Sequence, residues 1–71
     1  MDKNDMNQTE LLRARNEVAW VIGSRKGYQP GGFFRLIIDA MLYADPDNFA
    51  KLASVFPEYA QAIREFREGI L

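Results

Sequence analysis

The strongest indication of the fold is the almost entirely apolar stretch from Gly32 to Ala44, which reads GFFRLIIDAMLYA. On a helix, with about 100° per residue, only Arg35 and Asp39 interrupt its apolar surface. A surface helix has a single apolar stripe, whereas a helix that is apolar nearly all round is buried. We therefore expect residues 32–44 to form a buried helix at the centre of a small helical domain.

Three further helices are predicted from capping residues, prolines and the spacing of apolar side chains. Suitable first residues are Asn7 with Glu10, which resembles a capping box, and the pairs Asp45-Pro46 and Phe56-Pro57. The predicted helices span residues 8–22, 32–44, 46–55 and 57–68. No alternation of apolar and polar residues is long enough for a strand. The expected fold is all-α, a compact bundle of four short helices in one domain, residues 1–71, with 1–6 as a frayed lead.

The inner faces of the first and last helices are predicted from apolar residues three and four apart. In the first helix these are Leu11, Ala14, Val18, Val21 and Ile22. In the last helix they are Tyr59, Ala62, Ile63 and Phe66, and the charged residues Arg64, Glu65, Arg67 and Glu68 are expected to face solvent.

Catalysis is not expected, because the chain has no histidine and no cysteine. Nucleophile–base pairs built on these residues are therefore absent. A zinc site would need carboxylates alone, which is rare, and disulfides cannot form. Below about 80 residues a helical domain also has little room for a ligand pocket. We predict a protein that is not an enzyme and that holds no metal or cofactor.

The sequence also lacks the features of membrane and secreted proteins. No segment approaches the roughly 20 apolar residues of a membrane span. The first ten residues, MDKNDMNQTE, contain no apolar core of a secretory signal. We therefore expect a cytoplasmic protein without membrane contact.

The charges are unevenly distributed along the chain, although the net charge is only −1. Residues 1–12 carry −2, residues 13–36 carry +4 and residues 37–71 carry −3. The basic and acidic parts could complement each other within one chain or between two copies. The basic part could equally meet an acidic partner.

Trp20 departs from the apolar pattern of its helix, because it lies on the polar side near Arg13. One interpretation is that it folds under the following loop, against Tyr28 or the fourth helix. The other is that it anchors an interface, since tryptophan and arginine are enriched among residues that dominate binding energy. The candidate residues for contact with a partner are Trp20, Arg13, Tyr28, Ile70 and Leu71.

A second hypothesis concerns the basic loop SRKGYQPG, which precedes the helix at residues 32–44. Free backbone N–H groups at a helix N-terminus favour anions, so Arg25, Lys26 and Arg35 are candidates for contact with nucleic acid or phosphate. The loop is neither a P-loop nor a Rossmann turn. The modest net charge and the mixed charges of residues 46–68 argue against a DNA-reading helix.

Protein–protein interaction is the function that these features favour. A chain of 71 residues buries only about 60% of its unfolded surface, so it often needs a partner for stability. Four short helices leave little cover for Phe33, Phe34, Ile38, Leu42 and Tyr43. We therefore predict a homodimer, an adaptor or a module that docks on a larger protein. The alternative is a small protein that contacts nucleic acid or phosphate through residues 13–35.

Residues 32–67 resemble small helical proteins of unknown function encoded by bacteria, phages and mobile elements. Some such proteins bind and block a larger protein. The resemblance therefore implies a small inhibitor, a special case of the interaction module.

Overall fold

The protein is a bundle of four α-helices in the computed structural model, which describes residues 7–24 and 27–69. The helices are α1 (Gln8–Val21), α2 (Gly32–Tyr43), α3 (Pro46–Val55) and α4 (Pro57–Arg67). The predicted fold class is confirmed, and three of the helices end one residue earlier than predicted. The lead at residues 1–6 lies outside the described part of the chain.

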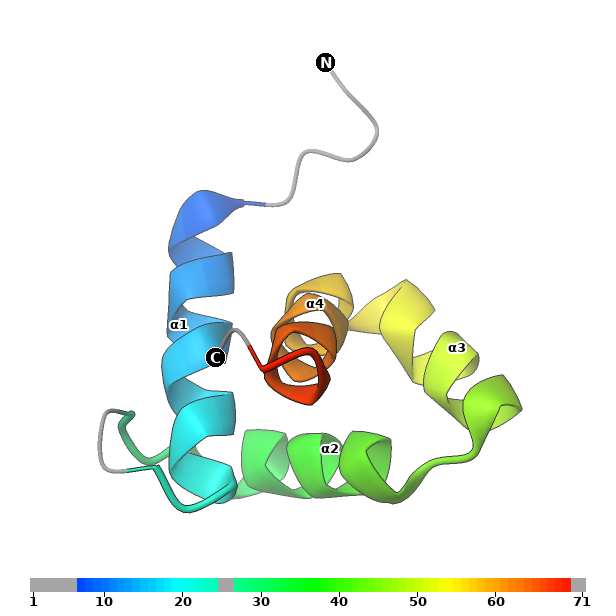
Figure 1. Ribbon diagram of the computed structural model, residues 1–71, viewed down its shortest axis with the longest axis horizontal. Coiled ribbons are helices and arrows are strands. Elements are labelled where there is room, and N and C mark those ends of the chain that lie inside the picture. Colours follow the sequence, from blue (N-terminus) through cyan, green and yellow to red (C-terminus); the bar gives the residue numbers. More distant parts are fainter. Residues whose placement is uncertain (1–6, 25–26, 70–71) are drawn as a thin grey trace.

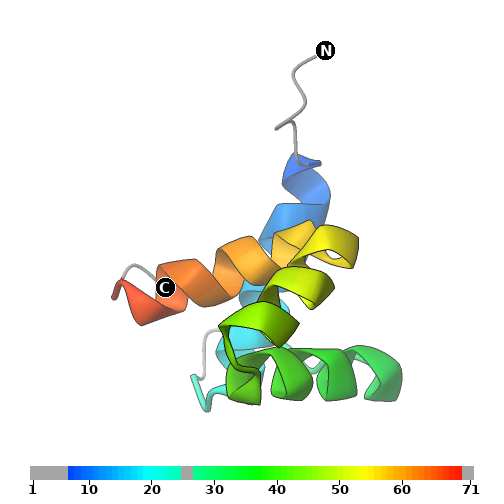
Figure 2. The same cartoon turned by 90° about the vertical axis from the view of Figure 1, so that its right-hand side faces the viewer.

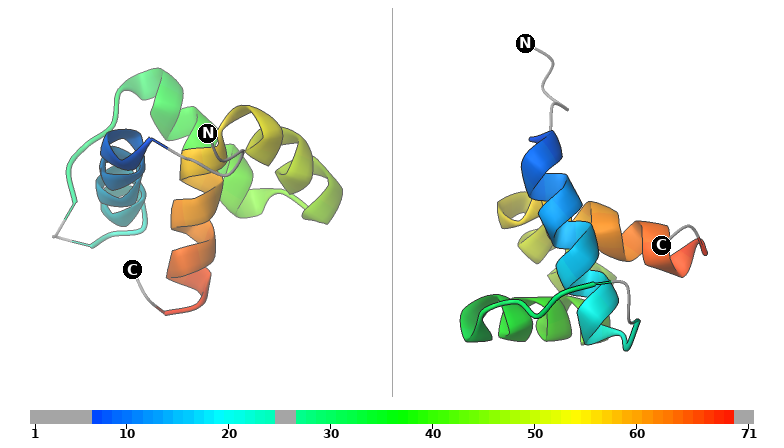
Figure 3. Two further views of the ribbon diagram at one scale, coloured as in Figure 1. Left: turned by 90° about the horizontal axis from the view of Figure 1, so that it is seen from above. Right: turned by 90° about the vertical axis from the view of Figure 1, so that its left-hand side faces the viewer.

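The helices are arranged around α4. In Figure 1, α4 is viewed almost end-on, and α1, α2 and α3 lie on three sides of it. Figures 2 and 3 show that α4 crosses α1 and that α2 forms one outer edge of the molecule. The contact between α1 and α4 is the most extensive one between helices. The first and last helices, far apart in the sequence, therefore hold the fold together.

All four helices contribute to the core. The largest fully buried side chains are Val18 of α1, Ile38 and Met41 of α2, and Ile63 of α4. Phe49 brings α3 to the same cluster. Burying each such side chain stabilises the fold by about 1.5–3 kcal/mol before the entropy of ordering is counted.

The predicted helix boundaries are explained by their caps. The Asn7 side chain accepts a hydrogen bond from the Glu10 N–H at 3.1 Å, and the Asp45 side chain accepts one from the Asn48 N–H at 2.8 Å. Each bond satisfies an N–H that has no partner within its helix. Gly23, just beyond α1, has φ +94°, a left-handed conformation that glycine adopts without steric cost.

The expectation that residues 32–44 are buried nearly all round is wrong. Only Ile38 and Met41 of α2 are buried, whereas Phe33, Leu36 and Tyr43 are 62%, 68% and 89% exposed. The enclosed helix is α4. Its Ala60 and Ala62 are completely buried, and such small side chains let neighbouring helices approach closely. The less apolar helix therefore occupies the centre.

The predicted solvent-facing position of Glu65 is also wrong, because this side chain is buried between α1 and α4. Arg15 donates to both carboxylate oxygens at 2.7 and 2.8 Å, and Gln61 donates at 3.1 Å. The hydrogen bonds from Arg15 hold the pKa of Glu65 below its ordinary value, although burial acts in the opposite direction. Phe66, predicted to face inward, is 38% exposed.

A second polar link joins the same two helices. The Tyr59 hydroxyl of α4 donates to the buried Glu17 carboxylate of α1. Burial, helped by this carboxylate, raises the pKa of Tyr59, so the hydroxyl stays protonated and able to donate. The Tyr59 ring packs on Phe34 of α2, with centroids 5.6 Å apart, and Phe56 completes the cluster. The inner side of α2 is thereby attached to the α1–α4 pair.

Candidate interaction surface

The outer side of α2 carries an exposed apolar stripe. Its members are spaced three, four and three residues apart, which places them on one side of the helix over about 15 Å. The outer stripe of α2 consists of Phe33, Leu36, Ala40 and Tyr43, all exposed. In Figures 1 and 2, α2 lies at one edge of the molecule. At one end of the stripe, the Phe33 ring packs edge-on against Phe34 and Phe56, with ring centroids 5.1 and 6.5 Å apart. Exposed large apolar side chains gathered on one face are typical of binding surfaces.

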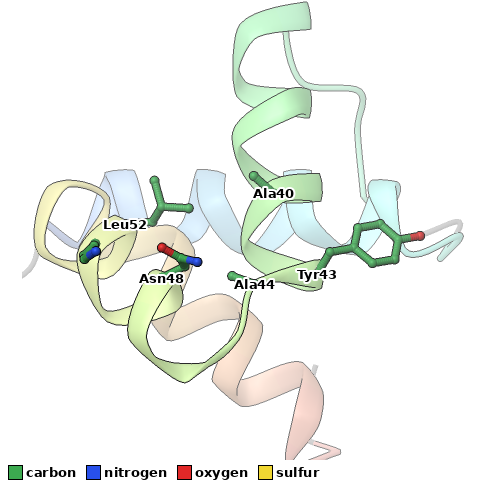
Figure 4. A pocket seen from close by; sticks show the side chains of 6 residues that line it. Ala40, Tyr43, Ala44, Asn48 and Leu52 are labelled. Atoms are coloured by element: carbon green, nitrogen blue, oxygen red, sulfur yellow. The ribbon is translucent and has the colours of Figure 1, made fainter.

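A hollow of about 460 Å³ lies beside the stripe, between α2 and α3. Figure 4 shows Ala40 of α2 and Ala44, the residue just after α2, on the side of Asn48 and Leu52 of α3. Tyr43 also lines the hollow, and its ring extends away from α3. Lys51 supplies a positive charge at the same hollow. Small side chains on one wall and a leucine on the other form a mainly apolar depression that can receive a protruding side chain.

A second hollow, of about 380 Å³, lies on the other side of α3, next to α4. The guanidinium groups of Arg64 and Arg67 each lie 5.3 Å from the centre of the Phe49 ring. Arg67 also donates to the Leu42 carbonyl at 3.3 Å. Within residues 7–24 and 27–69, neither arginine forms an ion pair. This side of the molecule is therefore basic as well as partly apolar.

Trp20 is half-buried and lies close to both the following loop and α2. A Cβ on Gly27 would come within 2.6 Å of the Trp20 backbone nitrogen, so the loop passes directly over α1 at this point. The guanidinium of Arg35 lies 5.3 Å from the centre of the Trp20 ring. Both the loop and α2 thus contact the tryptophan, and its role in partner binding stays a prediction.

The other predicted contact residues are not gathered around Trp20. Arg13 was expected beside it, but Arg13 forms an ion pair with Glu10 at 2.6 Å and lies over the Phe34 ring. Tyr28 is 48% exposed, and its backbone N–H donates to the Asn16 carbonyl. Ile70 and Leu71 lie outside the described residues.

The candidate anion contacts are described only in part. Arg25 and Lys26 lie outside the described residues. Arg35 forms an ion pair with Asp39, with Nε and Oδ2 3.5 Å apart, in addition to its contact with Trp20. Its charge is therefore already balanced within α2.

Sequence reasoning missed Leu36 as a surface residue, although a signal was present, whereas Tyr43 was among the residues expected to lack cover. Both lie on the helix beside Asp39, three residues before it and four after it. An aspartate without a buried partner faces water, and its neighbours on the helix surface then do so as well. The abundance of other apolar residues in α2 obscured this pattern.

The described residues contain no group of three or more acidic, histidine or cysteine side chains placed to hold a metal ion. None of the four helices is both long enough and apolar enough to cross a membrane. Comparisons with protein-family models, with curated proteins and with solved structures give no match.

Proposed function

We propose that this protein is a non-enzymatic interaction module that binds another protein chain through the outer side of α2. The observation that supports this proposal is the outer stripe of α2, in which Leu36 and Tyr43 are 68% and 89% exposed. Aromatic and large aliphatic side chains that lose contact with water supply most of the free energy of protein association. The hollow beside Ala40 adds a depression of the kind that receives a side chain from a partner.

The exposed stripe is not needed to attach α2 to the core. The same helix buries Ile38 and Met41 completely, so α2 is already attached to the core by its inner side. Two apolar sides on one helix exceed what attachment to this small core requires. Modulation of a larger protein, as adaptor or inhibitor, and self-association are the two forms that such a module takes.

The alternative, contact with nucleic acid or phosphate through residues 13–35, has less support. Binding to phosphates depends on cations that can exchange counterions for phosphate. The described cations of this region have acidic neighbours instead: Arg13 pairs with Glu10, Arg15 with Glu65 and Arg35 with Asp39.

The proposal is tested by photo-cross-linking in cells that express the chain. A benzophenone amino acid is placed at position 36 in one variant and at position 12 in a matched control. Leu12 is also a surface leucine, 59% exposed, but it belongs to α1. We expect discrete protein adducts from position 36 and none from position 12.

Adduct mass then separates the two forms of the module, because a species of twice the chain mass indicates self-association and any other mass indicates a different protein. Equal labelling at both positions, or no adduct at position 36, contradicts the proposal.

A further inference from the structure

We infer that the outer stripe of α2 binds the same stripe of a second copy, with the two α2 helices antiparallel and related by a two-fold axis. This inference rests on the proposed function, because it names the partner of the same surface. Three features of α2 support it: the spacing of the stripe, the charges beside it and the hollow next to it.

The spacing of the stripe reads the same in both directions. The steps of three, four and three residues are symmetric about the level of Ile38, halfway along the stripe. A two-fold axis at this level places Phe33 opposite Tyr43 of the second copy, and Leu36 opposite Ala40. An aromatic side chain then lies opposite an aromatic one, and the large Leu36 lies opposite the small Ala40. Close helix packing requires such complementary sizes.

The charges beside the stripe are also self-complementary. In a two-fold antiparallel pair, the side of the helix that carries Arg35 and Asp39 faces the same side of the second helix. Arg35 of one copy and Asp39 of the other are then separated by only about 3 Å along the helix axis. Each Arg35, already paired with Asp39 of its own helix at 3.5 Å, then lies next to Asp39 of the second copy as well. The two aspartates meet near the two-fold axis, with one arginine beyond each of them.

The hollow between α2 and α3 completes the fit. Ala40 lies in its wall, with Leu52 opposite. Leu36 of the second copy, placed over Ala40, therefore lies at the mouth of this hollow. Each copy inserts one leucine and receives one, as in the reciprocal contacts of a symmetric interface.

The size of the contact sets the expected affinity. One helix pair of about 15 Å falls at the low end of specific interfaces, which bury roughly 1,200 Å² or less in total. We therefore expect a reversible dimer whose population depends on protein concentration, and not a permanent one.

Sedimentation equilibrium over a concentration series tests the dimer. The wild-type chain should change from monomer to dimer as its concentration rises. Leu36→Glu should weaken the dimer on the order of 100-fold, because each dimer loses two leucine contacts, each worth about tenfold. Leu12→Glu, which makes the same change at an exposed leucine of α1, should dimerise like the wild type. A monomer at every concentration, or equal effects of the two substitutions, overturns the inference.

The antiparallel register is tested by disulfide formation, which is simple to interpret because the chain has no cysteine. Leu36→Cys mixed with Ala40→Cys should give a mixed disulfide dimer faster than either variant alone, since Leu36 lies opposite Ala40. Faster bonding of Leu36→Cys with itself would indicate parallel helices and contradict the proposed arrangement.

These results are separable from the test of the proposed function. Cross-links from position 36 to a different protein, together with a monomer in sedimentation, reject the second copy but retain the interaction module. A monomer without any cross-link at position 36 rejects both.

Discussion

α2 and α4 are helices of similar length that differ in how composition relates to burial. α2 is the more apolar helix, yet only Ile38 and Met41 are buried. α4 carries charged residues along much of its length, yet it is surrounded by the other three helices. The comparison shows that small side chains and satisfied polar groups decide which helix is enclosed, more than total hydrophobicity does.

The same comparison separates stability from binding. Residues on α4 hold the fold, through Ile63 in the core and the Glu65 carboxylate bound by Arg15. On the outer stripe of α2, Phe33 packs edge-on against Phe34 and Phe56, whereas Leu36 and Tyr43 are mostly exposed and are proposed to contact a partner. Substitutions on α4 should therefore lower the stability of the fold, whereas substitutions on the outer stripe of α2 should weaken binding.

The largest expected effect on stability is at Ile63. Ile63→Ala removes a completely buried side chain and leaves a cavity, so we expect a loss of about 3–4 kcal/mol. Leu36→Ala should change the stability of the monomer by no more than about 0.5 kcal/mol, because the side chain is on the surface. Urea unfolding at a concentration where the chain is monomeric measures both. Equal losses would contradict the assignment of α4 as the central helix.

The close approach of helices to α4 is tested by enlarging a small residue. Ala60→Leu should destabilise the fold by about 1–3 kcal/mol, because Ala60 is completely buried and the added atoms have no space. Ala40→Leu makes the same change on the exposed side of α2 and should leave the thermal midpoint of the monomer nearly unchanged. A tolerated leucine at position 60 would show that α4 is not closely packed.

The buried carboxylate of α4 predicts a pH dependence. The folded-state pKa of Glu65 is lowered, so its stabilisation is present above the ordinary value near 4.5 and is lost as the pH falls through the lowered folded value. Glu65→Gln should therefore cost about 1–2 kcal/mol at pH 7 and progressively less in acid. Urea unfolding at several pH values checks this, with the exposed Glu68→Gln as control. A difference that stays constant down to pH 2 would contradict the ion pair with Arg15.

The smallest expected effect concerns the charges beside the outer stripe. Arg35→Glu and Asp39→Arg should each weaken the dimer, because each places like charges opposite each other, at a cost of about 0.5–1 kcal/mol per pair. A mixture of the two variants restores opposite charges only between copies. Sedimentation should therefore show tighter association in the mixture than in either variant alone. A contact formed only within one α2 predicts no such recovery.

The positions of the helices could be predicted because their signals are local. Asn7, Asp45 and Pro57 specify helix starts through their own chemistry, and the structure confirms the starts that they mark. Burial could not be predicted in the same way. Arg15 and Glu65 are fifty residues apart, and Glu17 and Tyr59 forty-two, so nothing near either acid indicates its partner. The helical pattern shows which side chains share a face, and not which face meets the core.

The sequence predicted that the protein has an apolar interaction surface, but not which face carries it. The sequence favoured an interaction protein with excess apolar surface, and Tyr43 was among the residues expected to lack cover. The specific face was missed because α2 was interpreted as the central helix. α4 occupies the centre instead, and α2 lies at one edge of the molecule.

Amide ¹H–¹⁵N spectra of the wild-type chain test the role of α2. The spectra are recorded while the chain is diluted from a concentration at which the dimer forms. We predict that the concentration-dependent shifts lie on residues 32–44 and on the adjacent side of α3, around Asn48 and Leu52. The resonances of Leu12 and of the buried Ile63 should stay constant. Shifts centred on α1 or α4, with α2 unchanged, would contradict the assignment of α2 as the interaction helix.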